Sequence, residues 1–118
     1  MKAGLSKIQI ETIGNVLAPY ADKIDRVAVF GSRAQGTHRD NSDLDLVIYG
    51  ALLEQDIDRI WTLFQESSLP FSVDVKGYEQ IQYAPLRAHI DRVQTTLLTH
   101  DELIQVKGAG GITRELWL

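Results

Sequence analysis

The chain has 118 residues, of which 44% are hydrophobic and 24% are charged, and this size suits a single compact domain with one modest core. The net charge of -4 argues against a protein that grips the backbone of long nucleic acid, because that task needs a basic surface. The lack of cysteine excludes disulfides and thiolate metal sites, and no apolar stretch suits a secretory signal or a membrane span, so we expect a cytoplasmic protein.

A capping box opens the first predicted helix. Ser6 is followed by Gln9 three residues later, and apolar residues then recur at helical spacing, which predicts a helix over residues 6–18. A strand is expected next, from Arg26 to Phe30, and it is apolar from Val27 onward. A continuously apolar strand is typical of a central position in a sheet, with burial on both faces.

A turn of small residues follows this strand directly. Gly31 permits a positive φ angle and a close approach of the backbone to a ligand, and Ser32 is a good N-cap for a short turn over residues 33–35. Gly36 then ends the turn. Free backbone N–H groups at such a turn favour an anion, so the segment is a candidate phosphate-binding loop.

Two predicted strands carry acidic side chains on one face. In the strand expected over residues 43–49, Asp43 and Asp45 point to one side, because side chains two apart on a strand share a face, whereas the intervening leucines point to the other. The segment 71–77 alternates in the same way and adds Asp74. If the two strands are neighbours, all three carboxylates lie on the same open face.

Three close carboxylates repel one another unless a cation neutralises them. Mg²⁺ prefers oxygen ligands and usually takes one or two protein carboxylates together with substrate phosphates and water. Two such ions can clamp the attacking and leaving oxygens of a phosphoryl or nucleotidyl transfer. The pattern therefore predicts a site for two Mg²⁺ ions and a nucleoside triphosphate.

The rest of the chain predicts further helices. An apolar stripe over residues 52–67, which includes Trp61 as a core residue, indicates an amphipathic helix packed on the sheet. Pro85 can open a helix with inward apolar positions. Residues 93–99 suit either an edge strand or more helix. The expected fold is α/β, a two-layer mixed sheet with flanking helices and one open side.

Rival motifs are weaker. A P-loop needs Lys where this chain has Thr37 and Ser or Thr where it has His38. An EF-hand that begins at Asp40 lacks the required Gly and Glu, and the scattered histidines do not suit zinc. A simple solvated turn, with Asp43 as a cap and Asp45 exposed, is the remaining alternative.

The residues VFGSRAQG at positions 29–36 and SDLDL at positions 42–46 resemble the signature of the minimal nucleotidyltransferase (MNT) family within the polymerase β-like superfamily. The likeness extends over most of the chain. It implies a mixed sheet with flanking helices in the polymerase β-like palm fold, Mg²⁺ and nucleotide binding, and transfer of a nucleoside monophosphate with release of pyrophosphate.

The resemblance also implies roles for individual residues. Gly31 and Ser32 would hold the triphosphate, Asp43 and Asp45 would bind both metal ions, and Asp74 would bind the catalytic metal ion.

Two other side chains complete the expected nucleotide-binding set, namely Arg33 and Ser42. Many family members carry a basic residue where this chain has Gln35, so the grip on the triphosphate must rely on Arg33 or Arg39. The alternative for Arg33 is an ordinary surface salt bridge.

Family members of this size resemble antitoxins that adenylylate a helical HEPN-type partner. We therefore expect transfer of AMP from ATP to a hydroxyl of such a partner. One alternative is an inert antitoxin module that binds only nucleotide or partner, and another is a transferase for a small hydroxylated acceptor such as an aminoglycoside.

The chain is expected to form one domain over residues 1–118, with a tail from about residue 107 that is either a partner-binding arm or poorly ordered. Whether it forms a homo- or hetero-oligomer, and which base it prefers, stay open.

Overall fold

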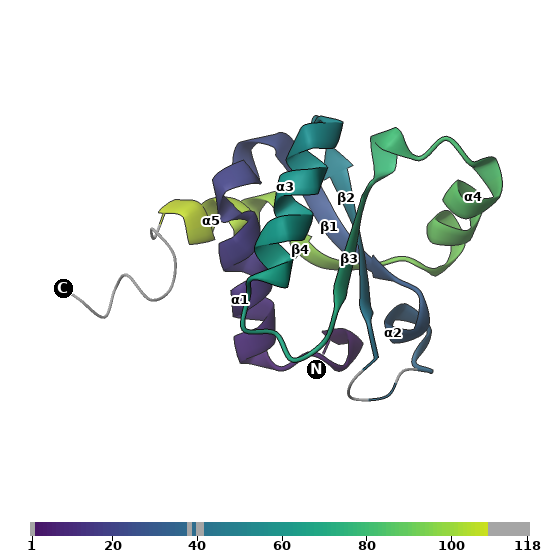
Figure 1. Ribbon diagram of the computed structural model, residues 1–118, viewed down its shortest axis with the longest axis horizontal. Helices are drawn as coiled ribbons and strands as arrows, with labels where there is room; N and C mark the ends of the chain where they lie inside the picture. The colour runs from purple at the N-terminus through teal and green to yellow at the C-terminus, as the bar shows by residue number, and fades with distance from the viewer. Residues whose placement is uncertain (1, 38, 40–41, 109–118) are drawn as a thin grey trace.

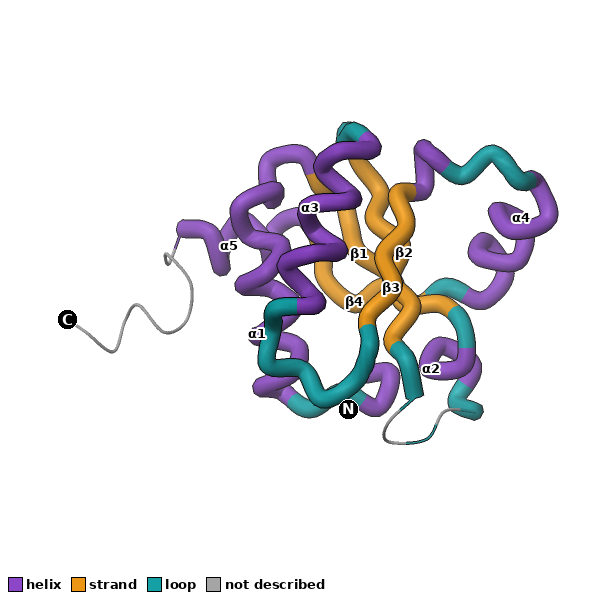
Figure 2. The backbone as a smooth tube through the Cα atoms, viewed as in Figure 1, coloured by secondary structure: helices purple, strands orange, loops and turns teal. Residues whose placement is uncertain are grey.

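The computed structural model describes residues 2–37, 39 and 42–108. Four strands form one mixed sheet in the order β3-β2-β1-β4, with β1 antiparallel to both of its neighbours and β2 parallel to β3 (Figures 1 and 2). The strands are β1 (Ile24–Phe30), β2 (Leu44–Gly50), β3 (Val73–Gly77) and β4 (Thr95–Thr99). The predicted α/β fold with a mixed sheet and flanking helices is confirmed.

Helices cover both faces of the sheet. Figure 1 shows α1 (Lys7–Leu17), α3 (Glu54–Gln65) and α5 (His100–Gly108) on one side, and α4 (Ala84–Val93) on the other. The remaining short pieces are η1 (Lys2–Gly4), η2 (Ala18–Lys23), α2 (Ser32–Gln35) and η3 (Tyr78–Gln80).

Each face has its own apolar cluster. The larger one lies under α1, α3 and α5 and includes the inward side chains of β2, namely Leu44, Leu46 and Ile48, all at most 1% exposed. The smaller one lies under α4 and consists of Ala28, Phe30, Val47, Ile81 and Ile90. The face that was expected to stay open is therefore partly covered, because α4 buries Ile90 against it.

The first helix begins where the sequence predicts. The Ser6 Oγ accepts a hydrogen bond from the Gln9 backbone N–H at 3.1 Å, and the Ser6 N–H donates to the Gln9 side-chain oxygen at 2.9 Å. This capping box satisfies two backbone N–H groups that would otherwise lack partners at the helix start. The central position of β1 is also confirmed, because β2 and β4 flank it.

Other expectations were wrong or incomplete. Trp61 is 46% exposed and is not a core residue, whereas Ile57, Ile60 and Phe64 of the same helix are buried. In the ambiguous segment at 93–99, Val93 ends α4 and residues 95–99 form the edge strand β4, and α5 follows it without having been predicted. No helix in the described part of the chain is long and apolar enough to span a membrane. Lys107 and Gly108 end α5, so the expected tail lies, from residue 109, outside the described residues.

The capping box gives a direct test of the helix start. Replacing Ser6 with Ala removes the acceptor for the Gln9 N–H, and we expect the free energy of unfolding to fall by about 1 kcal/mol. Denaturant unfolding followed by circular dichroism measures this loss. Thr12→Ala is a suitable control, since its hydroxyl only donates to the Ile8 carbonyl within the helix. Equal stability of Ser6→Ala and the unchanged protein would contradict the role of the cap.

Candidate functional site

Two aspartates meet across the parallel pair of strands. Asp45 of β2 lies directly opposite Asp74 of β3 in the register. Both point away from the larger cluster, because their neighbours Leu44, Leu46 and Val73 are buried in it. Directly opposed residues of adjacent strands lie about 5 Å apart, so the two carboxylates are close neighbours. Asp43 comes one residue before β2 and is exposed.

The negative charges of the acidic side chains on this face repel one another. Burial raises the pKa of Asp45 above its ordinary value, and the negative charges of Asp74 and Asp43 raise it further. Lys76 acts in the opposite direction. Its ammonium group lies 3.4 Å from a carboxylate oxygen of Asp74 on the same face. This face therefore attracts cations, and a lysine supplies part of the neutralising charge.

Gly31 lies against the Asp45 carboxylate. Phe30 is the register partner of Asp45, and the chain then turns at Gly31 with φ of +75°. A Cβ atom at this position would overlap a carboxylate oxygen of Asp45. Only glycine fits here, because any side chain would both strain the backbone and displace the carboxylate.

The turn after Gly31 differs in one detail from the prediction. Gly31 itself precedes the first helical residue of α2, so Ser32 is the first residue of that short helix and not its N-cap. Gly36 ends it in the left-handed conformation with φ of +75°, as expected. The structure thus places Gly31 and Ser32 at the same end of the sheet as Asp45.

Arg33 is inside the protein. Its residue is 3% exposed, so the alternative of a surface salt bridge is wrong. The guanidinium donates hydrogen bonds from Nε and Nη2 to the Ser42 carbonyl, at 3.2 and 3.0 Å, and from Nη1 to the Ala3 carbonyl at 3.1 Å. The neighbouring Arg39, in contrast, is exposed.

The last predicted site residue, Ser42, closes a turn. Its hydroxyl oxygen accepts a hydrogen bond from the Arg39 backbone N–H at 2.7 Å, and its own N–H donates to the Arg39 carbonyl at 3.0 Å. The expected nucleotide-binding residues and the acidic group therefore come from adjoining segments at one end of the sheet.

The donor set suits a hard divalent cation that shares its ligands with a substrate. Among residues 2–37, 39 and 42–108, no three Asp, Glu, His or Cys side chains form a ready-made metal-binding group. Asp45 and Asp74 nevertheless present oxygen donors side by side and repel each other when both are ionised. Mg²⁺ fits such a pair, because phosphate oxygens and water normally complete its octahedron.

Aromatic residues that the sequence did not reveal lie farther along the same face. The rings of Tyr49 and Tyr78 stack at 4.7 Å, the Arg26 guanidinium lies over Tyr49, and Arg87 of α4 lies over Tyr78. The Tyr78 hydroxyl donates to a carboxylate oxygen of Asp91 at 2.8 Å. These contacts hold α4 on the sheet. They join residues 9 to 29 positions apart, so no local pattern could have indicated them.

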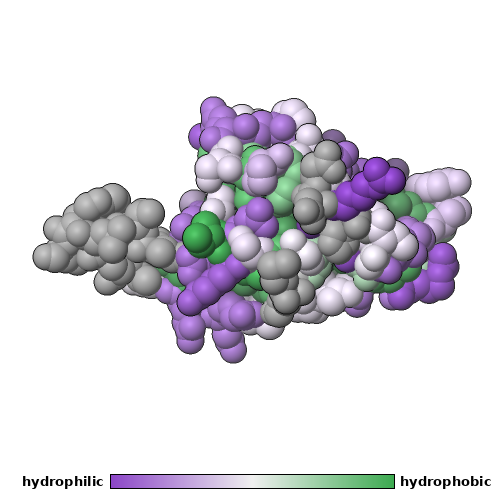
Figure 3. Space-filling view, turned by 90° about the horizontal axis from the view of Figure 1, so that it is seen from below, coloured by the Kyte–Doolittle hydropathy of each residue, from purple (hydrophilic) through white to green (hydrophobic). Residues whose placement is uncertain are grey.

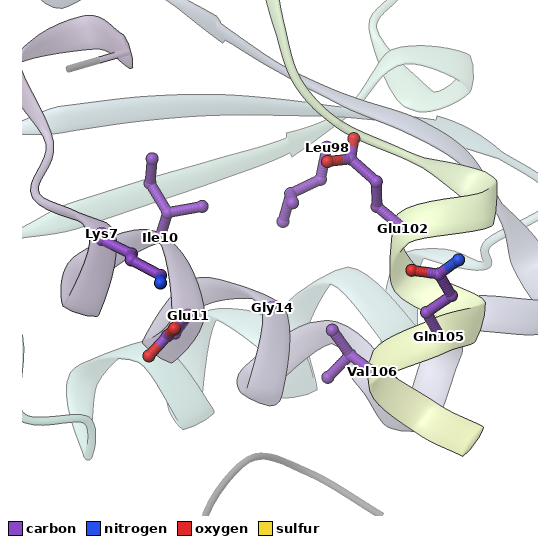
Figure 4. Close-up of a pocket in the computed structure, with 8 residues that line it drawn as sticks. All are labelled: Lys7, Ile10, Glu11, Gly14, Leu98, Glu102, Gln105 and Val106. Atoms are coloured by element: carbon purple, nitrogen blue, oxygen red, sulfur yellow. The ribbon is translucent and has the colours of Figure 1, made fainter. Parts of the chain in front are cut away.

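A separate cavity lies on the other side of the sheet. It has a volume of about 530 Å³ and is lined by apolar side chains of α1, β4 and α5, including Ile10, Leu98 and Val106, with Lys7 and Glu102 among the polar groups (Figure 4). This cavity therefore lies on the side of the sheet that α1, α3 and α5 cover and not on the acidic face.

Figure 3 shows the surface of the molecule from below, the side on which α2 lies in Figure 1. Hydrophilic and intermediate residues cover most of the coloured surface there.

Comparisons with known proteins agree with this fold. A protein-family model described as "Polymerase beta, Nucleotidyltransferase" matches residues 11–103. Among solved structures, a toxin–antitoxin crystallised with AMP-PNP is similar, with 23% identity, a TM-score of 0.61, and coverage of 92% of this chain and 86% of that chain. A mutant of the toxin–antitoxin MntA-HpeT is similar too, with 20% identity, a TM-score of 0.61 and the same coverage of 92% and 86%. No similar sequence was found among curated proteins.

The raised pKa of Asp45 predicts a gain of stability when its charge is removed. The folded protein holds the Asp45 proton to higher pH than the unfolded chain, whose pKa is near 3.8, so stability falls as pH rises from that value through the folded pKa. In the absence of metal, Asp45→Asn should therefore melt at a higher temperature than the unchanged protein at neutral pH. The difference should shrink as the pH approaches 3.8.

Thermal unfolding across this pH range, with chelator present, measures the effect. Asp58→Asn is a matched control, because Asp58 is an exposed residue of α3, away from the acidic face. A melting temperature of Asp45→Asn at or below that of the unchanged protein at neutral pH would show that the carboxylate carries no such cost.

Proposed function

Because the chain belongs to the polymerase beta nucleotidyltransferase family, we propose that it transfers AMP from ATP to the hydroxyl group of an acceptor protein. The observation that carries this proposal is the direct opposition of Asp45 and Asp74 next to the glycine turn at Gly31. An acidic pair beside a turn that only glycine can form suits a metal-bound triphosphate.

The proposed metal ligands are the three aspartates of the acidic face, with the roles that the family resemblance implies. Asp43 and Asp45 would bind two Mg²⁺ ions, and Asp74 would bind the catalytic one. Bound Mg²⁺ would neutralise the triphosphate and lower the pKa of the acceptor hydroxyl. The backbone at Gly31 and Ser32 would lie along the phosphates, since no side chain at Gly31 stands between them and the Asp45 carboxylate.

The reaction is an in-line displacement at the α-phosphorus. The acceptor oxygen forms a bond to this atom while the bond to the oxygen that bridges the α- and β-phosphates breaks. Pyrophosphate leaves, and the hydroxyl proton is released to solvent. The fixed carboxylates of the sheet contribute by orienting the charged groups before the reaction begins, which avoids reorganisation in the transition state.

The acceptor is proposed to be a helical HEPN-type toxin. The two similar structures are toxin–antitoxin complexes, and one of them was crystallised with the ATP analogue AMP-PNP. The second is a mutant in which two aspartates, two positions apart, are replaced by glutamate. Asp43 and Asp45 have the same spacing in this chain. These likenesses support an antitoxin role, and the nucleotide in the first complex supports ATP as the substrate.

Transfer of label from α-³²P-labelled ATP to the protein encoded beside this chain tests the proposal. We expect Mg²⁺-dependent labelling of that partner, and a loss of at least about a hundredfold in Asp45→Asn and in Asp74→Asn. Asp58→Asn, on the far side of the sheet, should label the partner normally.

Three results would contradict the proposal. Full activity of either site variant would remove the carboxylates from the mechanism. Binding of ATP without labelling of any acceptor would instead indicate an inert antitoxin module, whereas labelling of an aminoglycoside would indicate a small-molecule transferase.

The ion pair between Lys76 and Asp74 leads to a separate prediction. The lysine ammonium competes with metal for the Asp74 carboxylate, so Lys76→Met should bind Mn²⁺, used in place of Mg²⁺, about two- to fivefold more tightly in the absence of nucleotide. Titration calorimetry measures this. Lys23→Met is the matched control. The Lys23 ammonium lies at the same distance, 3.4 Å, from a carboxylate oxygen of Asp56, and this ion pair is away from the site. Equal affinity of Lys76→Met and the unchanged protein would show that the pair does not oppose the metal.

A further inference from the structure

The buried guanidinium of Arg33 connects segments that are distant in the sequence. Two of its nitrogen atoms donate to one acceptor, the Ser42 carbonyl, and a third donates to the Ala3 carbonyl. Burying a charged group is costly unless hydrogen bonds replace its water. Arg33 is 3% exposed, and these hydrogen bonds replace water around its charged group. The planar guanidinium presents its N–H groups in directions that reach both carbonyls.

The fourth contact reaches the segment before β3. The guanidinium lies over the Phe71 ring at 4.4 Å from its centre, and Phe71 packs against the larger apolar cluster. Phe71 comes three residues before Asp74 in the sequence. Arg33 therefore touches both polypeptide segments that lead into the acidic residues.

The Ser42 carbonyl has a particular importance, because it belongs to the peptide unit that joins Ser42 to Asp43. Fixing this carbonyl fixes the direction in which the chain enters Asp43 and β2. One residue later, the Leu44 N–H donates to the Ser72 carbonyl at 2.9 Å, which joins the same stretch to the start of β3. Arg33 itself lies on α2, immediately after Gly31 and Ser32.

We propose that Arg33 is a positioning residue, which locks Ser42 and Asp43 against α2 and so holds the acidic residues in register with the Gly31–Ser32 turn. This inference rests on the proposed function for its consequence, namely metal binding, but not for the lock itself. Arg33 acts through the Ser42 carbonyl and not by contact with phosphate. Among the described residues of this loop, the exposed Arg39 is the basic side chain that could meet the triphosphate.

Arg33→Lys separates the charge from the shape. Lysine keeps the positive charge but cannot donate two parallel hydrogen bonds to one carbonyl while also reaching Ala3. We expect the lock to open, so that trypsin cleaves the native protein after Arg39 at least about tenfold faster, which mass analysis of the fragments detects. We also expect Mn²⁺ to bind about tenfold more weakly, a loss equivalent to about 1.4 kcal/mol.

A buried apolar variant controls for stability alone. Ile60→Val trims a fully buried residue of α3 and should cost about 0.5–1.5 kcal/mol without touching the lock. Its Mn²⁺ affinity and its cleavage after Arg39 should match those of the unchanged protein. If Arg33→Lys does not fold, Arg33→Gln, which retains a donor amide without a buried charge, takes its place with the same expected changes.

The outcomes are distinct. A folded Arg33 variant with unchanged cleavage after Arg39 would overturn the proposal, and so would changes in Ile60→Val that equal those of the Arg33 variant at the same loss of melting temperature. If the unchanged protein binds no Mn²⁺, the proposed function fails, whereas the cleavage after Arg39 still decides whether Arg33 locks the loop.

Discussion

Side chains alternate between the two faces of a β-strand, and this constraint joins the core of the protein to its acidic site. In β2, the residues that fill the larger cluster alternate with Asp45 and Val47, and in β3 Val73 and Val75 alternate with Asp74 and Lys76. Parallel pairing of the two strands then places Asp45 opposite Asp74. A shift by one residue in either strand would bury carboxylates in the core, so the same apolar contacts that stabilise the fold also fix the acidic pair.

Burial and repulsion disfavour the charged form of Asp45 beside Asp74, and the packing of the fold nevertheless holds the two side chains together. Burial and mutual repulsion raise the pKa of Asp45, and among the described residues Lys76 acts against this. In the proposed function, a bound cation would relieve this repulsion, which is already present in the folded protein. Helix α4 contributes from the same face, where it buries Phe30 and Val47 beside the acidic end and leaves the carboxylates accessible. The site thus combines packed side chains that support the strands with carboxylates that repel one another.

Most of the site follows from local patterns, whereas its support does not. Alternation along two short segments was sufficient to predict that Asp45 and Asp74 share a face, and the capping box was sufficient to place the start of α1. The helix α5 was not predicted, and the sequence left β4 open between an edge strand and more helix, since Thr95–Thr99 has no strong period and its place beside β1 depends on distant pairing. Trp61 misled because helical spacing shows that a residue lies near an apolar stripe, but not where the stripe ends. The burial of Arg33 depends on carbonyls 9 and 30 residues away, which no motif indicates.

The most direct test of the account is the location of the metal in solution. Mn²⁺ broadens the nuclear magnetic resonance signals of nearby atoms, so a titration with a non-hydrolysable ATP analogue present shows where the ion lies. We predict that the strongest broadening falls on the backbone amides of Gly31, Asp45 and Asp74 and disappears in Asp45→Asn. Broadening centred elsewhere, for example on Glu11 and Glu102 at the cavity between α1 and α5, would contradict a metal site on the acidic face.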